Sequence, residues 1–157
     1  MNLKFLAITG GVGGAKLSLG LSKLLDADEL AFVVNTGDDF LHFDLHISPD
    51  IDTLVYTLGG ESNTELGWGR KEESWNFMEA IEKLGGESWF RLGDKDLAMH
   101  IERTRLLRSG RTLTAVTHVL ASGFGISHPV FPMSDDPVRT RVQTPHGQMD
   151  FQHYFVR

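Results

Sequence analysis

Cysteine is absent from the 157-residue sequence, which excludes disulfide bonds, thiolate metal sites and cysteine nucleophiles. No run of lysine and arginine exceeds two residues, and 15 lysines and arginines against 21 aspartates and glutamates give a net charge of −6. This charge repels a phosphate backbone, so we do not expect nucleic acid as a partner. An anionic ligand of any kind would need local hydrogen-bond donors or a metal ion.

Long hydrophobic runs are also lacking. The first residues, MNLKFLAITGG, hold only a short apolar run, which is too short for the core of a signal peptide. No segment approaches the roughly 18 apolar residues of a membrane span. These absences predict a cytoplasmic protein without membrane contact. With 41% hydrophobic and 23% charged residues, we expect one folded domain over residues 1–157.

Apolar runs and turn residues alternate in the order of an α/β fold. Residues 4–9 stop at GGVGG, and residues 15–25 then show helical spacing. Residues 30–34 predict a buried strand that is followed directly by NTGDD. Ser48 and Pro49 form an N-cap and N1 pair for a helix over residues 50–58.

The second half continues with helices and short strands. Helices are predicted over residues 73–84, 94–108 and from Thr112 or Thr114 to about 121, with Leu97, Ala98 and Ile101 facing inward in the second of them. Short strands are predicted in SWFRLGDKD and over residues 130–133, and VRTRVQT and QMDFQHYFV predict a hairpin around PHG. We therefore predict a Rossmann-like three-layer α/β fold with a mainly parallel sheet and a C-terminal β-hairpin.

Four glycines separate the first strand from the first helix: Gly10, Gly11, Gly13 and Gly14. Backbone N–H groups at such a place, together with the helix dipole, can bind a phosphate. The loop lacks the ending of a P-loop, and Lys16 stands where the dinucleotide pattern has its third glycine. A tight turn packed against the sheet is the alternative.

Polar residues follow the second strand in NTGDDF, at the edge where open α/β sheets bind ligands. Asn35 and Thr36 can contact a ligand, and Asp38 or Asp39 can hold a ribose or a metal ion. Two adjacent acids in a loop can also be merely solvated. This loop is thus a candidate binding site with an ordinary alternative.

Two acids, Asp50 and Asp52, begin the predicted helix of SPDIDT. Each gains about 0.3–1 kcal/mol at most from the helix dipole, which is a sufficient reason for Asp50. Asp52 lies a turn into the helix and gains less. Its candidate roles are Mg²⁺ ligation or a hydrogen bond to an acceptor hydroxyl.

Two further loops combine acids with an arginine: Arg91, Asp94 and Asp96 in RLGDKD, and Ser134, Asp135, Asp136 and Arg139 in FPMSDDPVRT. Each can be a turn or an N-cap, but their shared location favours one polar crevice. The histidines give no zinc pattern, and His100, four residues after Asp96, predicts an ordinary side-chain pair.

Taken in order, GGVGGAKL, VVNTGDDF, HISPDIDTLVYTLGG, GWGRKEESW, WFRLGDKDLAMHIERT and FPMSDDPVRT resemble the 2-phospho-L-lactate transferase family of coenzyme F-420 biosynthesis over essentially the whole chain. The resemblance implies transfer of a phospholactyl group, or in bacteria a phosphoenolpyruvyl group, from a guanosine diphosphate donor. The acceptor would be the deazaflavin Fo, 7,8-didemethyl-8-hydroxy-5-deazariboflavin. Guanosine monophosphate (GMP) would be released, and Mg²⁺ is the implied metal.

The resemblance also implies residue roles. Asp52 and Arg91 match the family residues that contact Fo, and Asp50 and Asp52 are the expected catalytic and metal-binding acids. Trp68 or Trp75 is a candidate to flank the flat ring, with core packing as the alternative. The expected nucleotide site comprises Gly10, Gly11, Gly13, Gly14, Asn35, Thr36, Ser134 and Asp135.

Family members are longer, so residues 1–157 are expected to correspond to their N-terminal half. The other half would supply further sheet, donor contacts and oligomer surface, which leaves a homodimer open. One competing hypothesis is a non-catalytic nucleotide-sugar-binding regulator of a sister family with the same glycine loop. Another is a dinucleotide-dependent oxidoreductase, against which the missing third glycine counts. No motif distinguishes a lactate donor from an enolpyruvate donor.

Overall fold

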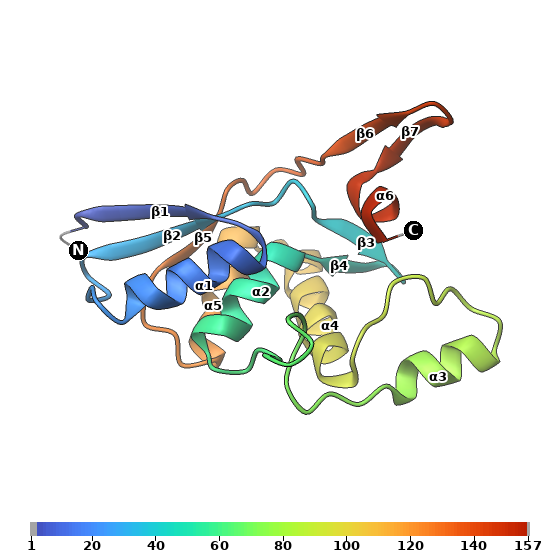
Figure 1. Ribbon diagram of the computed structural model, residues 1–157, viewed down its shortest axis with the longest axis horizontal. Helices are drawn as coiled ribbons and strands as arrows, with labels where there is room; N and C mark the ends of the chain where they lie inside the picture. Colours follow the sequence, from blue (N-terminus) through green and yellow to red (C-terminus); the bar gives the residue numbers. More distant parts are fainter. Residues whose placement is uncertain (1–2, 157) are drawn as a thin grey trace.

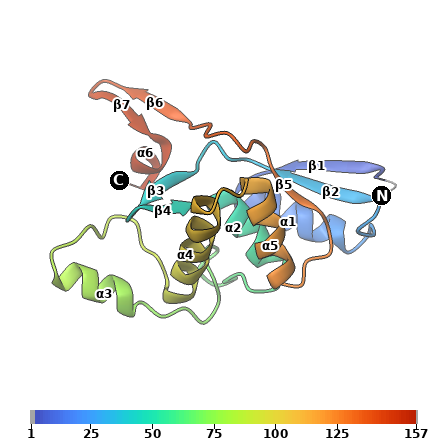
Figure 2. The same cartoon turned by 180° about the vertical axis from the view of Figure 1, so that it is seen from behind.

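The computed structural model describes residues 3–156. A parallel sheet of order β1-β2-β5 organises this part of the chain, with β1 and β5 on either side of β2. The helices α1, α2 and α5 lie on one side of this sheet in both views (Figures 1 and 2). The strands of the sheet are β1 (Phe5–Thr9), β2 (Leu30–Val34) and β5 (Val130–Pro132). The three helices are α1 (Gly11–Ser22), α2 (Pro49–Leu58) and α5 (Leu113–Gly123).

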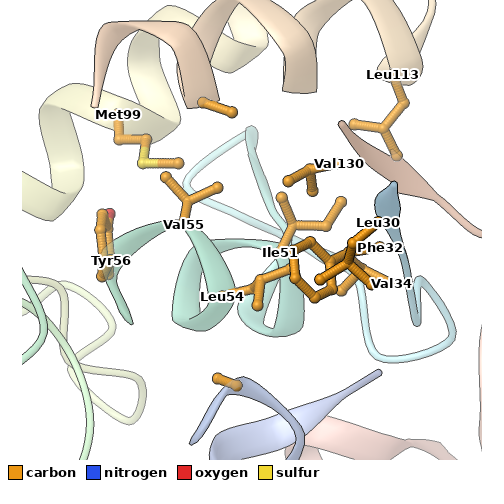
Figure 3. Packing of buried hydrophobic residues seen from close by; sticks show 12 residues of the cluster. Leu30, Phe32, Val34, Ile51, Leu54, Val55, Tyr56, Met99, Leu113 and Val130 are labelled. Atoms are coloured by element: carbon orange, nitrogen blue, oxygen red, sulfur yellow. The ribbon is translucent and has the colours of Figure 1, made fainter. Parts of the chain in front are cut away.

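The core lies between the central strand and helix α2. Leu30, Phe32 and Val34 of β2 are fully buried and belong to the same cluster as Ile51 and Val55 of α2. Figure 3 shows these side chains beside one another. Full burial of each such side chain contributes about 1.5–3 kcal/mol, so this cluster holds the sheet against α2 and fixes the position of the helix.

The other face of the sheet is uncovered in residues 3–156. Leu6 and Ile8 of β1 are 60% and 74% exposed, and Phe131 of β5 is 37% exposed. The α/β Rossmann-like class, the mainly parallel sheet and the C-terminal hairpin are confirmed. The expected third layer is not formed within the described residues, because no helix covers this face (Figure 1).

A second, aromatic cluster lies beside the ribbon of β3 (Phe40–His42) and β4 (Leu45–Ile47). Phe40, Ile47, Met78 and Leu92 are its buried members. Around it lie α3 (Asn76–Lys83), α4 (Asp94–Arg108), the hairpin of β6 (Arg141–Thr144) and β7 (Gly147–Asp150), and the short helix α6 (Phe151–Val156) (Figure 2).

Several predicted bounds shift. The helix after β1 starts at Gly11, so the glycines form its first turn instead of a separate loop. The strand predicted in SWFRLGDKD is wrong, because this segment is irregular and Leu92 anchors it in the aromatic cluster. Helix α3 starts at Asn76, three residues later than predicted. The second strand of the hairpin ends at Asp150, where α6 begins.

The buried face of α4 differs from the prediction. Ala98 and Ile101 are exposed, whereas His100 and Arg103 are buried. Leu97 does pack against the aromatic cluster, as predicted. An apolar pattern could not reveal His100 and Arg103, because their burial depends on Asp52 of α2. Elsewhere Thr112 does cap α5, with its hydroxyl accepting from the Ala115 N–H at 3.2 Å. Within residues 3–156, no helix is long and apolar enough to span a membrane.

Candidate functional site

A cavity of about 500 Å³ opens between α2, α4 and α6. This volume lies within the usual range of small-molecule sites. Aromatic side chains dominate its wall, and four ionisable side chains supply its polar part. The aromatic residues are Tyr56, Trp68, Trp89, Phe90 and Phe155, and the ionisable ones other than Tyr56 are Asp52, Arg91, Asp96 and His100.

The cavity brings together Asp52 and Arg91, which the sequence predicts to share a ligand. The guanidinium of Arg91 lies 4.3 Å from the ring centroid of Trp75, a cation–π contact that holds the exposed arginine in place. Of the two candidate tryptophans, Trp68 lines the cavity, whereas Trp75 does not line it and contacts Arg91. Trp89 lies in the irregular segment that was mistaken for a strand, so its role was missed.

Asp52 is held by Arg103, which the sequence analysis did not single out. Both side chains are buried, and two guanidinium nitrogens of Arg103 donate to the two carboxylate oxygens, one of them at 3.2 Å. Burial raises the pKa of Asp52, against the charge of Arg103. Burial also disfavours the charged guanidinium, but Asp52 outweighs this and the pKa of Arg103 is raised. The pair orients the Asp52 carboxylate at the cavity wall.

His100 and Asp96 extend this network along the cavity. His100 Nε2 lies 3.2 Å from Asp96 Oδ2, which confirms the predicted pair, and His100 Nδ1 lies 3.7 Å from Asp52 Oδ2. The hydroxyl of Tyr56 donates to Asp96. Burial opposes the ionised form of Asp96, but His100 and Tyr56 lower its pKa. The sequence does contain a signal for these residues, since Asp96, His100 and Arg103 follow helical spacing on α4.

Asp52, Asp96 and His100 also have ligand atoms within 4.8 Å of one another, a spacing suited to a metal ion. The existing contacts do not favour one. Arg103 already neutralises Asp52, and Tyr56 donates to Asp96. A guanidinium beside the group repels a second cation, so this cluster fits a hydrogen-bonded network better than Mg²⁺.

Asp50 faces the ends of the strands. Its two oxygens accept from the Gly11 N–H at 2.9 Å and from the side-chain amide of Asn35 at 2.8 Å. A Cβ at Gly10 would lie 2.9 Å from Asp50 Oδ2, so only glycine permits this approach. The structure therefore brings Gly10, Gly11 and Asn35 of the expected nucleotide site together with Asp50.

Asp50 and Asp52 contact different groups. Two residues along a helix turn the side-chain direction by about 200°, so Asp50 lies at the strand ends and Asp52 at the cavity. Asp38 interacts electrostatically with Asp50: burial and the charge of Asp50 raise the pKa of Asp38. Carboxylate oxygens are ligands that Mg²⁺ prefers. Asp38 therefore lies near enough to Asp50 to interact with its charge, whereas Asp52 faces the cavity.

The remaining candidates lie after β2 and β5. Thr36 is buried, and its carbonyl accepts from the Asp39 N–H. The hydroxyl of Ser134 accepts from the Asp136 N–H at 3.0 Å. Asp135 accepts from the Thr114 N–H at 2.7 Å and so caps α5. Asp135 is an anchor of the sheet edge as well as a nucleotide-site candidate.

Residues 5–157 match the family model described as 2-phospho-L-lactate transferase CofD. The chain belongs to the CofD family. This confirms the resemblance seen in the sequence motifs. It places the cavity and the strand-end site in a family whose description names a group transfer.

Curated relatives of the CofD-family chain bear two names. The 2-phospho-L-lactate transferase of Methanospirillum hungatei is 41% identical over 150 residues, covering 96% of this chain and 50% of the relative. That of Methanosarcina acetivorans is 42% identical over 149 residues, covering 95% and 48%. The phosphoenolpyruvate transferase of Streptomyces avermitilis is 39% identical over 160 residues, covering 99% and 50%. The chain spans about half the length of these relatives.

Proposed function

We propose that this CofD-family chain transfers a 2-phospho-L-lactate or phosphoenolpyruvate group from a guanosine diphosphate donor to Fo, with release of GMP. One observation above all supports the proposal. An aromatic cavity bearing Asp52 and Arg91 adjoins the same turn of α2 that presents Asp50 to the glycines and Asn35. An acceptor site and a donor site therefore meet at one helix end.

The cavity suits the acceptor. Fo is a flat tricyclic ring with a hydroxylated side chain, and aromatic walls bind such rings by stacking and area burial. Trp68, Trp89 and Phe90 supply these walls. Arg91 offers N–H donors to the polar edge of the ring, and Asp52 can accept from a hydroxyl group. Deep apolar walls with few polar groups are the usual design of such sites.

The strand ends suit the donor. Gly10, Gly11 and Asn35 lie around the N-terminus of α1, where the helix dipole favours anions. Asp50 with Asp38 would hold Mg²⁺. The ion, when bound, neutralises charge on the diphosphate of the donor. An acidic chain needs this neutralisation, because its own net charge is −6.

The chemistry follows from these positions. The acceptor hydroxyl oxygen of Fo forms a bond to the donor phosphorus next to the three-carbon acid, and the bond from that phosphorus to the GMP oxygen breaks. Asp52 accepts the hydroxyl proton, and its burial favours this by raising its pKa. Arg103 and His100 hold the carboxylate in place. Most of the rate gain in such a transfer comes from positioning and charge stabilisation.

Fluorescence titration of the purified chain with Fo tests the acceptor site. We expect saturable binding that weakens in Trp89→Ala and Arg91→Gln. A non-catalytic nucleotide-sugar-binding regulator would ignore Fo. The matched control is Trp75→Phe, which keeps an aromatic ring below Arg91 and should retain binding.

Transfer itself is tested by incubating Fo, the guanosine diphosphate donor and Mg²⁺ with the chain and recording a mass spectrum. The expected product is a deazaflavin heavier by the transferred group, together with GMP. Asp52→Asn should abolish it, whereas Asp28→Asn, an exposed acid far from the site, should not. Unchanged Fo with the wild-type chain, despite saturating Fo binding, would refute the transfer.

A further inference from the structure

We propose that Arg139 binds the phosphoryl group in transit between donor and acceptor. The inference rests on the proposed transfer and adds a residue to it. Arg139 belongs to the segment VRT that crosses from β5 to the hairpin. Three observations support this role: the backbone beside Arg139 is fixed at the strand ends, its guanidinium lies between the two proposed sites, and the groups that it contacts carry no negative charge.

The segment is fixed beside the donor site. The Thr140 N–H donates to the Gly37 carbonyl at 2.6 Å, and the Thr140 side chain interacts with Asp38. These contacts tie the backbone next to Arg139 to the loop after β2, the same loop that supplies Asn35. Arg139 is therefore held at the strand ends and not on a free loop.

The guanidinium of Arg139 spans the two sites. One terminal nitrogen, Nη1, lies 3.5 Å from the Thr36 carbonyl, on the donor side. The other, Nη2, lies 3.4 Å from Nε2 of His46, on β4 immediately before the start of α2. The backbone carbonyl of His46 accepts a hydrogen bond from Arg103, the residue that holds Asp52. Arg139 thus lies between the strand ends and the residues that orient the acceptor-side carboxylate.

The groups in direct contact with the Arg139 guanidinium are neutral, although Asp39 lies near enough for the charge of Arg139 to oppose the rise in its pKa. Within residues 3–156, no carboxylate oxygen lies within 4 Å of its side-chain nitrogens, whereas Arg70, Arg103 and Arg141 each have one. Arg139 instead donates to the carbonyls of Thr36 and Val138. His46 is neutral as well, since burial and the charges of Arg103 and Arg139 lower its pKa to about 4, so its ring brings no counter-charge to Arg139.

A half-buried guanidinium without an ion pair is uncommon, because partial desolvation disfavours the charge. Its planar fork matches phosphoryl oxygens, which can accept two parallel hydrogen bonds from it. Arg103 cannot take this role, because it is 0% exposed and already bonded to Asp52. Arg139 is the arginine at this junction that retains donors for a ligand anion.

The test compares Arg139→Gln, Arg139→Lys and Arg139→Ala with the wild-type chain in the transfer assay. We expect kcat to fall by about 100-fold in Arg139→Gln, as for other donors that stabilise developing charge. The lysine variant should keep part of the rate. Added guanidinium ion should partly restore Arg139→Ala, a rescue that a purely structural arginine would not show. Fo affinity, measured by fluorescence, should be unchanged in all three variants.

Arg141→Gln is the matched control, because Arg141 lies two residues away, is exposed and pairs with Asp150. It should leave kcat unchanged. A wild-type rate in Arg139→Gln would overturn the inference, as would loss of the folded state or of Fo binding in both Arg139→Gln and Arg139→Lys. An inactive wild-type chain would instead count against the proposed transfer, so the two failures are distinguishable.

Discussion

At the scale of single residues, the pair of Asp52 and Arg103 sets the character of the site. Both groups are buried, and each neutralises the charge of the other. Breaking a buried ion pair by removing one partner usually costs more than replacing both partners, because it leaves a charge without compensation. The pair therefore makes Asp52 difficult to vary for structural reasons as well as for the reasons proposed above.

Asp52→Asn should lower the free energy of unfolding by about 3–5 kcal/mol, because the guanidinium of Arg103 would remain buried without its counter-charge. Asp52→Asn combined with Arg103→Met should be closer to the wild-type value. Urea denaturation of the two variants measures the difference. Equal stabilities would mean that the pair is not a coupled unit.

Asp39 should make stability fall with rising pH. Burial raises its pKa from 3.8 to about 7, although Ser48, Arg103 and Arg139 act against this. Below about pH 4 the carboxyl is protonated in both states and has no effect. Between about pH 4 and 7 only the unfolded chain ionises it, which removes about 4 kcal/mol for a shift of about three units. Asp39→Asn should flatten this part of the curve.

Urea denaturation of the wild-type chain and Asp39→Asn at pH 5, 6 and 8 checks this prediction. As the pH rises, the free energy of unfolding of the wild-type chain should fall relative to that of Asp39→Asn. Asp28→Asn, at an exposed position, serves as the control. Parallel stability curves for the wild-type chain and Asp39→Asn would show that Asp39 is ionised in the folded state throughout.

At the scale of secondary-structure elements, the adjacent glycines Gly13 and Gly14 of α1 have different surroundings. A Cβ at Gly14 would lie 2.4 Å from the hydroxyl of Thr9, whereas a Cβ at Gly13 would meet nothing within 4 Å. Alanine is favoured over glycine in a helix by about 1 kcal/mol. We expect Gly13→Ala to stabilise the chain by about that amount and Gly14→Ala to destabilise it.

Thermal unfolding of the two alanine variants gives the sign directly. Both residues lie in the same helix and receive the same substitution, so each is the control for the other. If both variants were stabilised, the packing of α1 against Thr9 would be looser than the structure indicates. If both were destabilised, the first turn would depend on glycine for another reason.

Elements defined by local chemistry were predictable, and elements defined by distant partners were not. Residues 30–34 are apolar throughout, and Thr112 precedes an apolar helix, so β2 and the cap of α5 follow from the sequence. The buried face of α4 depends on Asp52, which lies 51 residues before Arg103. Ser48 is the N-cap residue of α2 and Pro49 follows it, as predicted, but the Ser48 hydroxyl donates to Asp39 and makes no capping hydrogen bond to the helix.

The site shows the same division. The shared position of Asp52 and Arg91 on the cavity followed from the motifs. That Asp50 and Asp52 face apart did not, because the sequence places them side by side and only the rotation of α2 separates them. The contact of Asp135 with the Thr114 N–H did not follow from the motifs either, because it joins residues 21 positions apart, and Asp135 stays a predicted nucleotide-site residue beside this contact.

At the scale of the whole molecule, the uncovered sheet face is the largest departure from a buried α/β sheet. Within the described residues, α1, α2 and α5 lie on one side of the sheet only (Figure 1), and Leu6, Ile8 and Phe131 of its strands are exposed. Parallel sheets are usually covered on both faces, and exposed apolar patches promote association. We expect the isolated 157-residue chain to self-associate at high concentration through this face.

Ile8→Lys should reduce that association while changing the free energy of unfolding by less than about 0.5 kcal/mol, since Ile8 is 74% exposed. Analytical ultracentrifugation over a range of concentrations measures association, and urea denaturation measures stability. Phe32→Lys, at a fully buried position on the same sheet, is the contrasting variant and should prevent folding. A large loss of stability in Ile8→Lys would mean that this face is packed.

The opposed directions of Asp50 and Asp52 have a mechanical consequence. Because one turn of α2 bears both carboxylates, the gap between the proposed donor and acceptor sites is set by the geometry of a helix and not by a hinge. Inserting one residue between them would swing one carboxylate by about 100° relative to the other. The reaction distance should therefore tolerate changes of side chain around it far better than any change in the length of this turn.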